Sequence, residues 1–570
     1  MQYFCIFLFF IFILFLLMPS FFFHINSYLL GENSVDIDGN IWYGWFTKRC
    51  ILKHDFASLY HTDFVAYPTG KNLIFDLGFP LMHILFIPFQ SFLNLPLSYN
   101  LFLITIVSIN FLIFLFIINY LLKDKWAGIV GGIFFSINPY IIYHINSGRV
   151  NELAVFWLPL YILFLFKIKE EGNNFRFKNT ISASLILILT ALSYWYYFIF
   201  LIILTLVYTF SLPRKTIKGI FLTKIVLVYT ISIITIIVLF FPSLAKGIRP
   251  LGYKIVKPFP SYLSIMQNKT LPHFRSLIEE TSLNRLPPTF LTLIFIMFIL
   301  SIKWWKNNAP WLITGSLFFI LSWGLSLYLY GKILCLPYIL FYYLVPTFPR
   351  LWWPINCFSI TILCGAILAS NLIHKLDTKK NVKTTVFLFL IFIYLVPFLN
   401  KQYKVGDSFL TTETFYYAPY RKINKAYYYL KTQPDCAIIE LPFNKGYLDF
   451  LRNQIIHNKK TFNCPGYAIK EELWPQKHLD FLRSNALLNY IDNLCSSENF
   501  KSAISEKEIK QSLKQLYNIG FRFIVINPKY FKNYHHKKKI LSEIKTLFKK
   551  PYKKFPDGII LYKIENMIKL

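Results

Sequence analysis

Long apolar stretches recur along the first 400 residues of the chain and restrict what it can fold into. Each has roughly 17 to 25 mostly uncharged residues, enough for a helix to cross about 30 Å of hydrocarbon. With 55% hydrophobic residues and a mean hydropathy of +0.46, the chain is too apolar for an ordinary soluble protein. We therefore predict an α-helical multi-pass membrane protein with about eleven transmembrane helices, at residues 3–23, 99–121, 126–145, 152–168, 180–196, 197–212, 223–243, 288–303, 309–329, 355–373 and 384–400.

Lysine and arginine in the short loops give the orientation, because such loops stay in the cytoplasm. The basic loops lie at 122–125, 167–178, 213–224, 303–308 and 374–383. The outer segments are then 24–98, 146–151, 244–287, 330–354 and the region after residue 400. We interpret 3–23 as a retained first helix, because it has no basic n-region and no small-residue cleavage site. The proline-rich stretch 77–97 is expected to form helices along the outer membrane surface.

The charge balance is strongly basic, with a net charge of +32. A nucleic-acid binder could carry such a charge, but about half of the basic residues flank apolar stretches, where orientation and anionic lipid explain them. The eight cysteines form no C-x-x-C pair, which argues against metal or thiol chemistry. The expected partners are therefore membrane lipids and not nucleic acids.

The composition changes after Asn400. Residues 401–570 carry 30 Lys plus Arg and 15 Asp plus Glu, without a stretch that could span a membrane. Short β-type runs at 437–441, 521–526 and 558–562 alternate with helical patterns near 418–432, 473–494 and 504–518. We expect a transmembrane domain at 1–400 and an extracytoplasmic mixed α/β domain at 401–570.

An acidic segment follows the first apolar stretch, within the predicted first outer loop 24–98. Asp36 and Asp38 could simply form a solvated turn. At the edge of a water-poor cavity, however, a carboxylate becomes more basic and suits the removal of a proton from a hydroxyl. Trp42 and Trp45 nearby could anchor at the membrane interface or stack on a sugar ring.

Two further outer segments carry charge beside apolar helices. In 146–152, Arg149 suits a phosphate, Asn151 adds a polar contact for substrate, and Glu152 could assist the first acid or bind a cation. A structural ion pair between Arg149 and Glu152 is the alternative. Arg350, at the predicted mouth of 355–373, could grip a lipid phosphate or only extend to the interface.

A series of short motifs occupies residues 30–165: the run from Asp36 to Trp45, then YPTGKNL at 67–73, LSYNL at 97–101, FSINPY at 135–140, GRVNE at 148–152 and WLPL at 157–160. Their order and spacing resemble a group of bacterial multi-pass proteins similar to the GT-C membrane glycosyltransferases. That superfamily includes the protein mannosyltransferases and the aminoarabinose transferases. The resemblance continues weakly at 346–358 and at Glu440-Leu441-Pro442-Phe443.

The resemblance implies a reaction at the outer face of the inner membrane. A sugar would leave its polyprenyl phosphate carrier for a glycan, lipid or protein acceptor, with inversion and with an Asp of the first outer loop as base. Asp36 best fits that base and Asp38 is the next choice, while Glu152 matches a second acidic position and Arg149 the phosphate. A divalent cation held by Asp36 and Glu152 is left open. Relatives often have Gly-His where this chain has Gly148-Arg149, so no His-dependent detail is carried over.

Two other functions are compatible with the sequence. One is a non-catalytic membrane scaffold that binds lipid-linked glycan through the outer domain. The other is a transporter, but the predicted spans contain almost no acidic residues, which argues against ion coupling.

Overall fold

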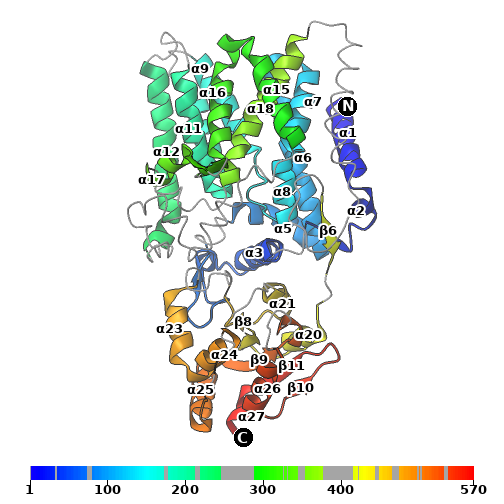
Figure 1. Ribbon diagram of the computed structural model, residues 1–570, viewed down its shortest axis with the longest axis vertical. Helices are drawn as coiled ribbons and strands as arrows, with labels where there is room; N and C mark the ends of the chain where they lie inside the picture. The colour runs from blue at the N-terminus through cyan, green and yellow to red at the C-terminus, as the bar shows by residue number, and fades with distance from the viewer. Residues whose placement is uncertain are drawn as a thin grey trace. The chain divides into compact units, whose positions relative to one another are not determined.

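The structure is a computed structural model that describes residues 2–31, 35–73, 80–171, 177–211, 219–245, 288–324, 326–329, 332–344, 354–376, 415–420, 423–442, 449–464, 474–496, 500, 503–531 and 537–569 (Figure 1). The chain divides into two compact units. Unit 1 comprises Met1–Ser34, Pro88–Leu239 and Pro258–Tyr420. Unit 2 comprises Val35–Ile87, Phe240–Lys257 and Arg421–Leu570.

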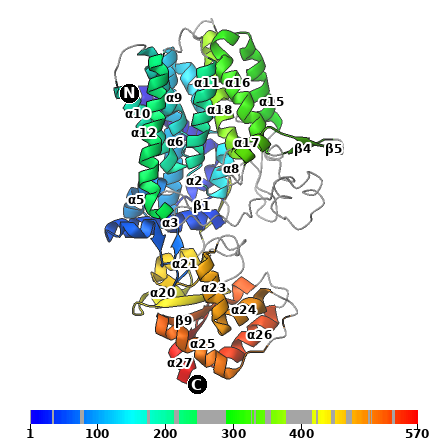
Figure 2. The ribbon, with the colours of Figure 1, turned by 90° about the vertical axis from the view of Figure 1, so that its left-hand side faces the viewer.

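Unit 1 is helical. Its described helices are α1 (Gln2–Leu17), α2 (Pro19–Phe23), α6 (Leu95–Leu122), α7 (Lys125–Ser136), α8 (Pro139–Ser147), α9 (Trp157–Glu170), α10 (Lys178–Ser193), α11 (Trp195–Phe210), α12 (Gly219–Ala245) as far as Leu239, α15 (Pro288–Ile302), α16 (Trp305–Leu321), α17 (Tyr338–Leu344) and α18 (Phe358–Lys375). Helix α7 packs between α6 and α18. Helix α10 packs against α9 and α11 (Figure 2). Strands β1 (Tyr28–Leu30) and β6 (Tyr417–Pro419) pair antiparallel at one end.

Three of the described helices are long and apolar enough to cross a membrane: Leu95–Leu122, Ile220–Phe241 and Pro354–Lys375. The bent pair α7 and α8 would be a fourth. Helices cover most of each of the first ten predicted spans, while 384–400 lies outside the described residues. The figure of about eleven spans therefore stays a prediction.

Proline divides two of the predicted spans. The expected helix 3–23 breaks at Met18, and 126–145 breaks before Pro139 with a bend of 40°. Proline lacks a backbone N–H and fits the first turn of a helix, so each one starts a new helix. Asn138 caps α8 by accepting a hydrogen bond from Ile141 N at 3.1 Å.

The C-terminal end predicted for the span 309–329 is wrong. Helix α16 stops at Leu321, and Gly324 adopts a φ of +85° in the left-handed region that favours glycine. The chain then forms β4 (Ser326–Leu329), which pairs antiparallel with β5 (Lys332–Cys335). An apolar run of this kind does not distinguish a strand from the end of a helix.

Unit 2 contains a five-stranded mixed sheet in the order β10-β11-β9-β7-β8. The strands are β7 (Ala437–Leu441), β8 (Lys460–Thr461), β9 (Phe521–Ile526), β10 (Lys553–Lys554) and β11 (Ile560–Lys563). β7 runs parallel to β8 and β9, and β11 runs antiparallel to β9 and β10. The strands predicted at 437–441 and 521–526 are confirmed, and the one predicted at 558–562 lies at 560–563.

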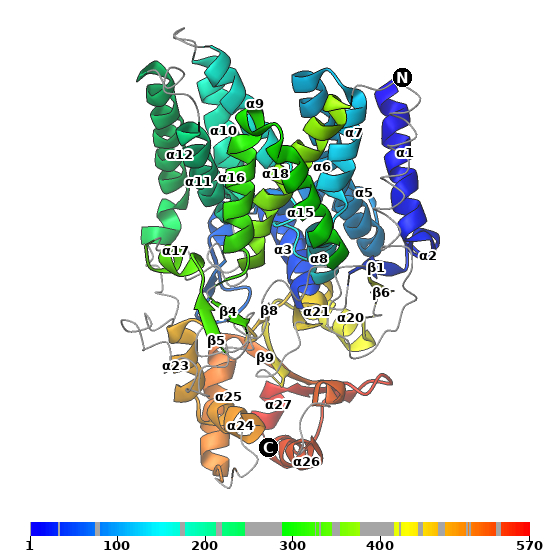
Figure 3. The same cartoon turned by 45° about the horizontal axis from the view of Figure 1, so that its top comes forward.

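Helices cover both faces of this sheet. Ala437, Ile439 and Leu441 pack into a core with residues of α23 (Gln476–Ser484), α24 (Ala486–Ser496), α25 (Glu506–Ile519), α26 (Lys537–Phe548) and α27 (Ile564–Lys569). Of these helices, α25 and α27 contact β9 (Figure 3). Ile438 packs on the other face with α20 (Lys425–Lys431). Since side chains alternate along a strand, Glu440 lies on the α20 face.

Residues 35–73 complete unit 2 from a distant part of the sequence. They form α3 (Val35–Leu52), the 3-10 turn η1 (Phe56–Leu59) and the short pair β2 (His61–Thr62) and β3 (Lys71–Asn72). Tyr67 N donates to Thr461 O at 3.0 Å, and Thr461 N donates to Phe64 O at 3.1 Å. Ala66 is buried in the same core as β7. Helix α5 (Leu81–Phe92) follows and is helical as predicted within 77–97.

Candidate functional site

The acidic segment opens helix α3 and does not form a solvated turn. Asp36 and Asp38 both lie in the first helical turn, where the positive end of the helix dipole favours negative charge. Farther along α3, Tyr43 and Cys50 are buried. Burial, aided by the charge of Asp55, raises the pKa of Cys50 to about 12. The Cys50 thiol is therefore protonated at neutral pH and unsuited to nucleophilic chemistry.

Asp38 is a buried partner of an arginine. Its side chain is 8% exposed, and its Oδ1 accepts a hydrogen bond from Arg452 Nε at 2.9 Å and a second one from Arg452 Nη2. Arg452 comes from α21 (Asp449–His457). A buried carboxylate needs such a partner, because an isolated charge is costly to bury. The ion pair gives Asp38 a structural role, because it holds α3 against α21.

Asp36 is partly exposed and lies two residues before Asp38, in the same helical turn. Its carbonyl oxygen accepts a hydrogen bond from Asn40 Nδ2 at 2.9 Å. Asn40 Oδ1 lies 2.9 Å from Nε2 of His83, which is buried in α5. The backbone that carries Asp36 is therefore held by α5 as well as by α21.

The two tryptophans of α3 differ in their surroundings. Trp42 is fully buried, stacks on Phe46 with ring centroids 5.0 Å apart and donates from Nε1 to Gln454 Oε1 at 2.8 Å. Core packing accounts for Trp42 without a ligand. Trp45 is half-buried, with its ring centroid 6.0 Å from that of Phe64.

Gln454 is the second residue of α21 that binds the acidic helix. Besides accepting from Trp42, it donates from Nε2 to Phe64 O at 2.6 Å and to Lys459 O at 2.9 Å. Its side chain thus connects α3, the segment before β3 and the segment before β8. Arg452 and Gln454 together fix the first two turns of α3.

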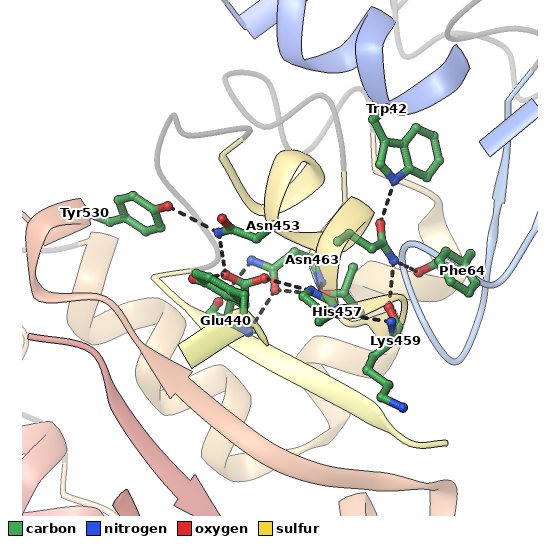
Figure 4. Close-up of polar contacts among 11 residues, drawn as sticks. Trp42, Phe64, Glu440, Asn453, His457, Lys459, Asn463 and Tyr530 are labelled. Carbon is green, nitrogen blue, oxygen red and sulfur yellow. Dashed lines mark hydrogen bonds and ion pairs between the residues drawn. The ribbon is translucent and has the colours of Figure 1, made fainter. Parts of the chain in front are cut away.

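Asn453 and His457 of α21 meet Glu440 of β7 in a buried polar cluster (Figure 4). Glu440 Oε2 accepts from Tyr427 Oη at 2.8 Å and from Asn453 Nδ2 at 3.4 Å. His457 Nδ1 accepts from Lys459 N at 3.0 Å, which places the ring proton on Nε2, 3.7 Å from Glu440 Oε1. Asn463 Oδ1 accepts a hydrogen bond from Glu440 N, and Asn463 Nδ2 donates one to Glu440 O, both at 3.0 Å. Glu440 therefore anchors α21 on the sheet.

Three predicted residues lie in unit 1, in the segment after α8. Helix α8 ends at Gly148, whose φ of +75° suits the left-handed cap position. Half-buried Arg149 donates from Nη1 to Tyr143 Oη at 3.1 Å, and its guanidinium stands 5.4 Å from the centroid of that ring. Glu152 is partly exposed, and its backbone oxygen accepts from Tyr197 Oη at 2.5 Å.

Asn151 is also partly exposed. Asn110 of α6 donates to Leu153 O at 2.9 Å, so α6 holds the segment that carries Asn151 and Glu152. The structure thus brings Arg149, Asn151 and Glu152 into one supported segment of unit 1. Asp36, Asp38, Trp42 and Trp45 belong to unit 2.

Arg350 lies outside the described residues. Within the described part of the chain, no group of three or more His, Cys, Asp or Glu side chains is placed to hold a metal ion. The divalent cation considered for Asp36 and Glu152 stays a prediction.

Sequence reasoning missed Arg452 and Gln454, although both support the acidic turn. Each lies more than 400 residues from its partner on α3, and no periodicity connects positions so far apart. Glu440 did leave a signal, because it is a charged residue inside the apolar strand Ala437–Leu441 and must find a partner when buried.

Comparisons with known proteins give distant similarity at most. No protein-family model and no curated protein matches the chain. Two crystal structures of the Archaeoglobus fulgidus oligosaccharyltransferase, one with zinc and sulfate and one in the apo form, are similar at 12% identity, with TM-scores of 0.46 and 0.47. The matches cover 88% and 91% of this chain, but only 64% and 69% of the oligosaccharyltransferase. A likeness at this level assigns neither a family nor an activity.

Proposed function

We propose that the chain is a membrane glycosyltransferase that moves a sugar from a polyprenyl-phosphate carrier to an acceptor on the outer membrane face. An acceptor hydroxyl attacks the anomeric carbon, the bond from that carbon to the phosphate oxygen breaks, and Asp36 takes the hydroxyl proton. The configuration at the anomeric carbon is inverted. The acceptor is a glycan, a lipid or a protein.

One observation carries the choice of Asp36. Two carboxylates share the first turn of α3, but Asp38 is buried against Arg452, whereas Asp36 is partly exposed. A general base must reach the proton that it removes and must be held in place. Asp36 meets both requirements, because its own turn is fixed by Asn40 and by the neighbouring ion pair.

The remaining roles follow from the resemblance, and each is proposed for its residue separately. Arg149 and Arg350 are partners for the phosphate of the donor, and Asn151 is a polar contact for substrate. Glu152 is an assisting acid or a ligand for a divalent cation. Trp45, with its half-buried ring, is the better of the two tryptophans for stacking on a sugar.

The test uses cells that lack the chain and are complemented with wild type, Asp36→Asn or Asp480→Asn. Asp480 is an exposed carboxylate of α23 and serves as the matched control. We expect equal amounts of all three proteins in the membrane. Asp36→Asn should lose a sugar from the surface glycan or another acceptor and accumulate the lipid-linked donor, because removal of a general base slows a reaction by roughly 100- to 10,000-fold.

The competing function is a scaffold that binds lipid-linked glycan without catalysis. In that case the deletion strain shows the glycan defect, but both Asp36→Asn and Asp480→Asn restore it. Equal restoration by the two variants would rule out Asp36 as the base.

A further inference from the structure

A groove with basic residues at its mouth lies in unit 1 between α1, α6 and α9. It has a volume of about 540 Å³, and apolar side chains form its walls: Ile113, Phe116, Ile117, Leu160 and Leu163. Tyr3, Asn119, Tyr120, Lys123 and Lys167 complete the lining. The groove thus has apolar walls and a polar rim.

The polar rim has a defined structure. The ammonium groups of Lys123 and Lys167 converge on the Tyr120 ring, 4.8 Å and 5.2 Å from its centroid. Lys123 follows the last turn of α6, and Lys167 lies in the last turn of α9. The charge at this rim is positive and arises from two different helices.

Contacts at the N-terminus of α1 close one side of the groove. Asn119 Nδ2 donates to Tyr3 Oη at 2.8 Å, and the Tyr3 ring packs on Phe116 with centroids 4.7 Å apart. Lys125 adds a third cation beside Tyr3, with its Nζ 5.9 Å from the ring centroid. The wall formed by α1 is therefore tied to α6 by both polar and aromatic contacts.

We propose that this groove binds an anionic phospholipid, with an acyl chain along the apolar wall and the phosphate at Lys123 and Lys167. Basic pockets between membrane helices on the cytoplasmic side suit anionic head groups. The lysine-rich loops predict that this end of unit 1 faces the cytoplasm. The groove fits one class of occupant, because its apolar walls favour a hydrocarbon chain and the lysines at its rim favour an anionic group.

This site is distinct from the segment that carries Arg149 and Glu152. Asn110 of α6 binds that segment through Leu153 O, and Lys123 lies further along the same helix. At a rise of about 1.5 Å per residue, the two positions are roughly 20 Å apart along the axis. The proposal therefore does not depend on the glycosyltransferase function.

The experiment measures lipid retained by the purified full-length protein in native mass spectrometry, with phosphatidylglycerol and phosphatidylcholine as probes. The test variant is Lys123→Gln/Lys167→Gln. The matched control is Lys303→Gln/Lys375→Gln, because those two lysines also stand over one ring, that of Trp304, at 5.5 Å and 6.0 Å, and neither lines the groove.

We expect wild type and the control to retain phosphatidylglycerol in preference to phosphatidylcholine. The test variant should bind phosphatidylglycerol roughly 10- to 30-fold more weakly, since each lysine near an anionic head group contributes. Equal binding by the test and control variants would overturn the proposal, as would equal retention of the two lipids by wild type.

A second variant separates lipid from free phosphate. Leu163→Trp fills the apolar wall and leaves both lysines in place, so it should also lose phosphatidylglycerol. Glycerophosphate, which has no acyl chain, should neither bind to wild type nor displace the lipid. Displacement by glycerophosphate, or unchanged lipid retention in Leu163→Trp, would show that the groove is not a lipid site.

Discussion

At the scale of single residues, the buried ion pair between Asp38 and Arg452 decides how the acidic turn is held. A buried pair adds little net stability when compared with apolar residues of the same size, but loss of one partner leaves an uncompensated charge. Asp38 and Arg452 are both less than one-tenth exposed. The pair therefore fixes the position of α3 on α21 and adds little to the net stability. The position of α3 in turn determines where Asp36 lies.

Asp38→Asn is expected to lower the free energy of unfolding of unit 2 by about 3 to 5 kcal/mol, because Arg452 stays buried without its counter-charge. Thermal unfolding of the purified protein in detergent measures the effect. The double variant Asp38→Asn/Arg452→Gln should lose less than the sum of the two single variants. Additive losses, or a melting temperature for Asp38→Asn equal to that of Asp480→Asn, would contradict the structural role.

His478 predicts a pH dependence of stability in unit 2. Its ring is buried against Phe462 and Trp474, with centroids 4.5 Å and 5.2 Å away. Burial is the main cause that lowers the pKa of His478 to about 3, and the charge of Lys71 also lowers it. A hydrogen bond with the backbone of Phe462 acts in the opposite direction. In the unfolded chain the same imidazole binds a proton below its ordinary pKa of about 6.5.

The unfolded state thus binds more protons than the folded state between about pH 3 and pH 6.5, so His478 makes the protein less stable as the pH falls through this range. The contribution is about 1.4 kcal/mol per pH unit. Comparison of wild type with His478→Phe by thermal unfolding at pH 7.5, 6.0 and 5.0 isolates it, and the variant should lose less stability on acidification. Parallel curves for the two proteins would contradict this assignment.

At the scale of elements, the nine-residue helix α21 connects the sheet to the acidic helix. Asn453 and His457 contact Glu440, while Arg452 and Gln454 contact α3. The sequence does not reveal this connection, because α21 carries no predicted helical pattern and its partners on α3 lie more than 400 residues away. By contrast, the predicted helix near 504–518 has a local signal, the capping box of Ser505 and Glu508, and is found at 506–519.

Gln454→Met tests the role of α21. The variant preserves the approximate volume but leaves Trp42 Nε1–H, Phe64 O and Lys459 O without their described partner. A buried polar group that loses its hydrogen bond costs about 1 to 3 kcal/mol, so we expect a loss of about 3 kcal/mol or more in the free energy of unfolding. Gln476→Met, on the exposed surface of α23, should change the melting temperature little. Equal melting temperatures for the two variants would refute the role.

At the scale of the whole molecule, the sequence predicts local structure well and distant assembly poorly. The length of the apolar stretches predicted the helices of unit 1, and short β-type runs predicted β7 and β9. Neither pattern predicts that residues 35–73 share a core with β7 and β8, because that assembly depends on the burial of Ala66 and the pairing of Tyr67 with Thr461. The division expected near residue 400 therefore stays a prediction, and residues 377–414 lie outside the described part.

The same limit applies to the candidate site. The carboxylates of α3 could be selected from the sequence, because acidic residues beside apolar stretches are costly unless they have a function. The preference for Asp36 over Asp38 has physical support only when Arg452 is seen against Asp38. Contacts between remote residues thus separate a structural carboxylate from a candidate base.

The most direct test of the central claim is the release of polyprenyl phosphate by the purified protein. Lipid extracted from deletion cells supplies the accumulated donor, envelope material from the same cells supplies the acceptor, and mass spectrometry measures the polyprenyl phosphate formed. We predict that wild type and Asp480→Asn release it together with transfer of the sugar, and that Asp36→Asn does so at least 100-fold more slowly. Release by Asp36→Asn at the wild-type rate would contradict the account.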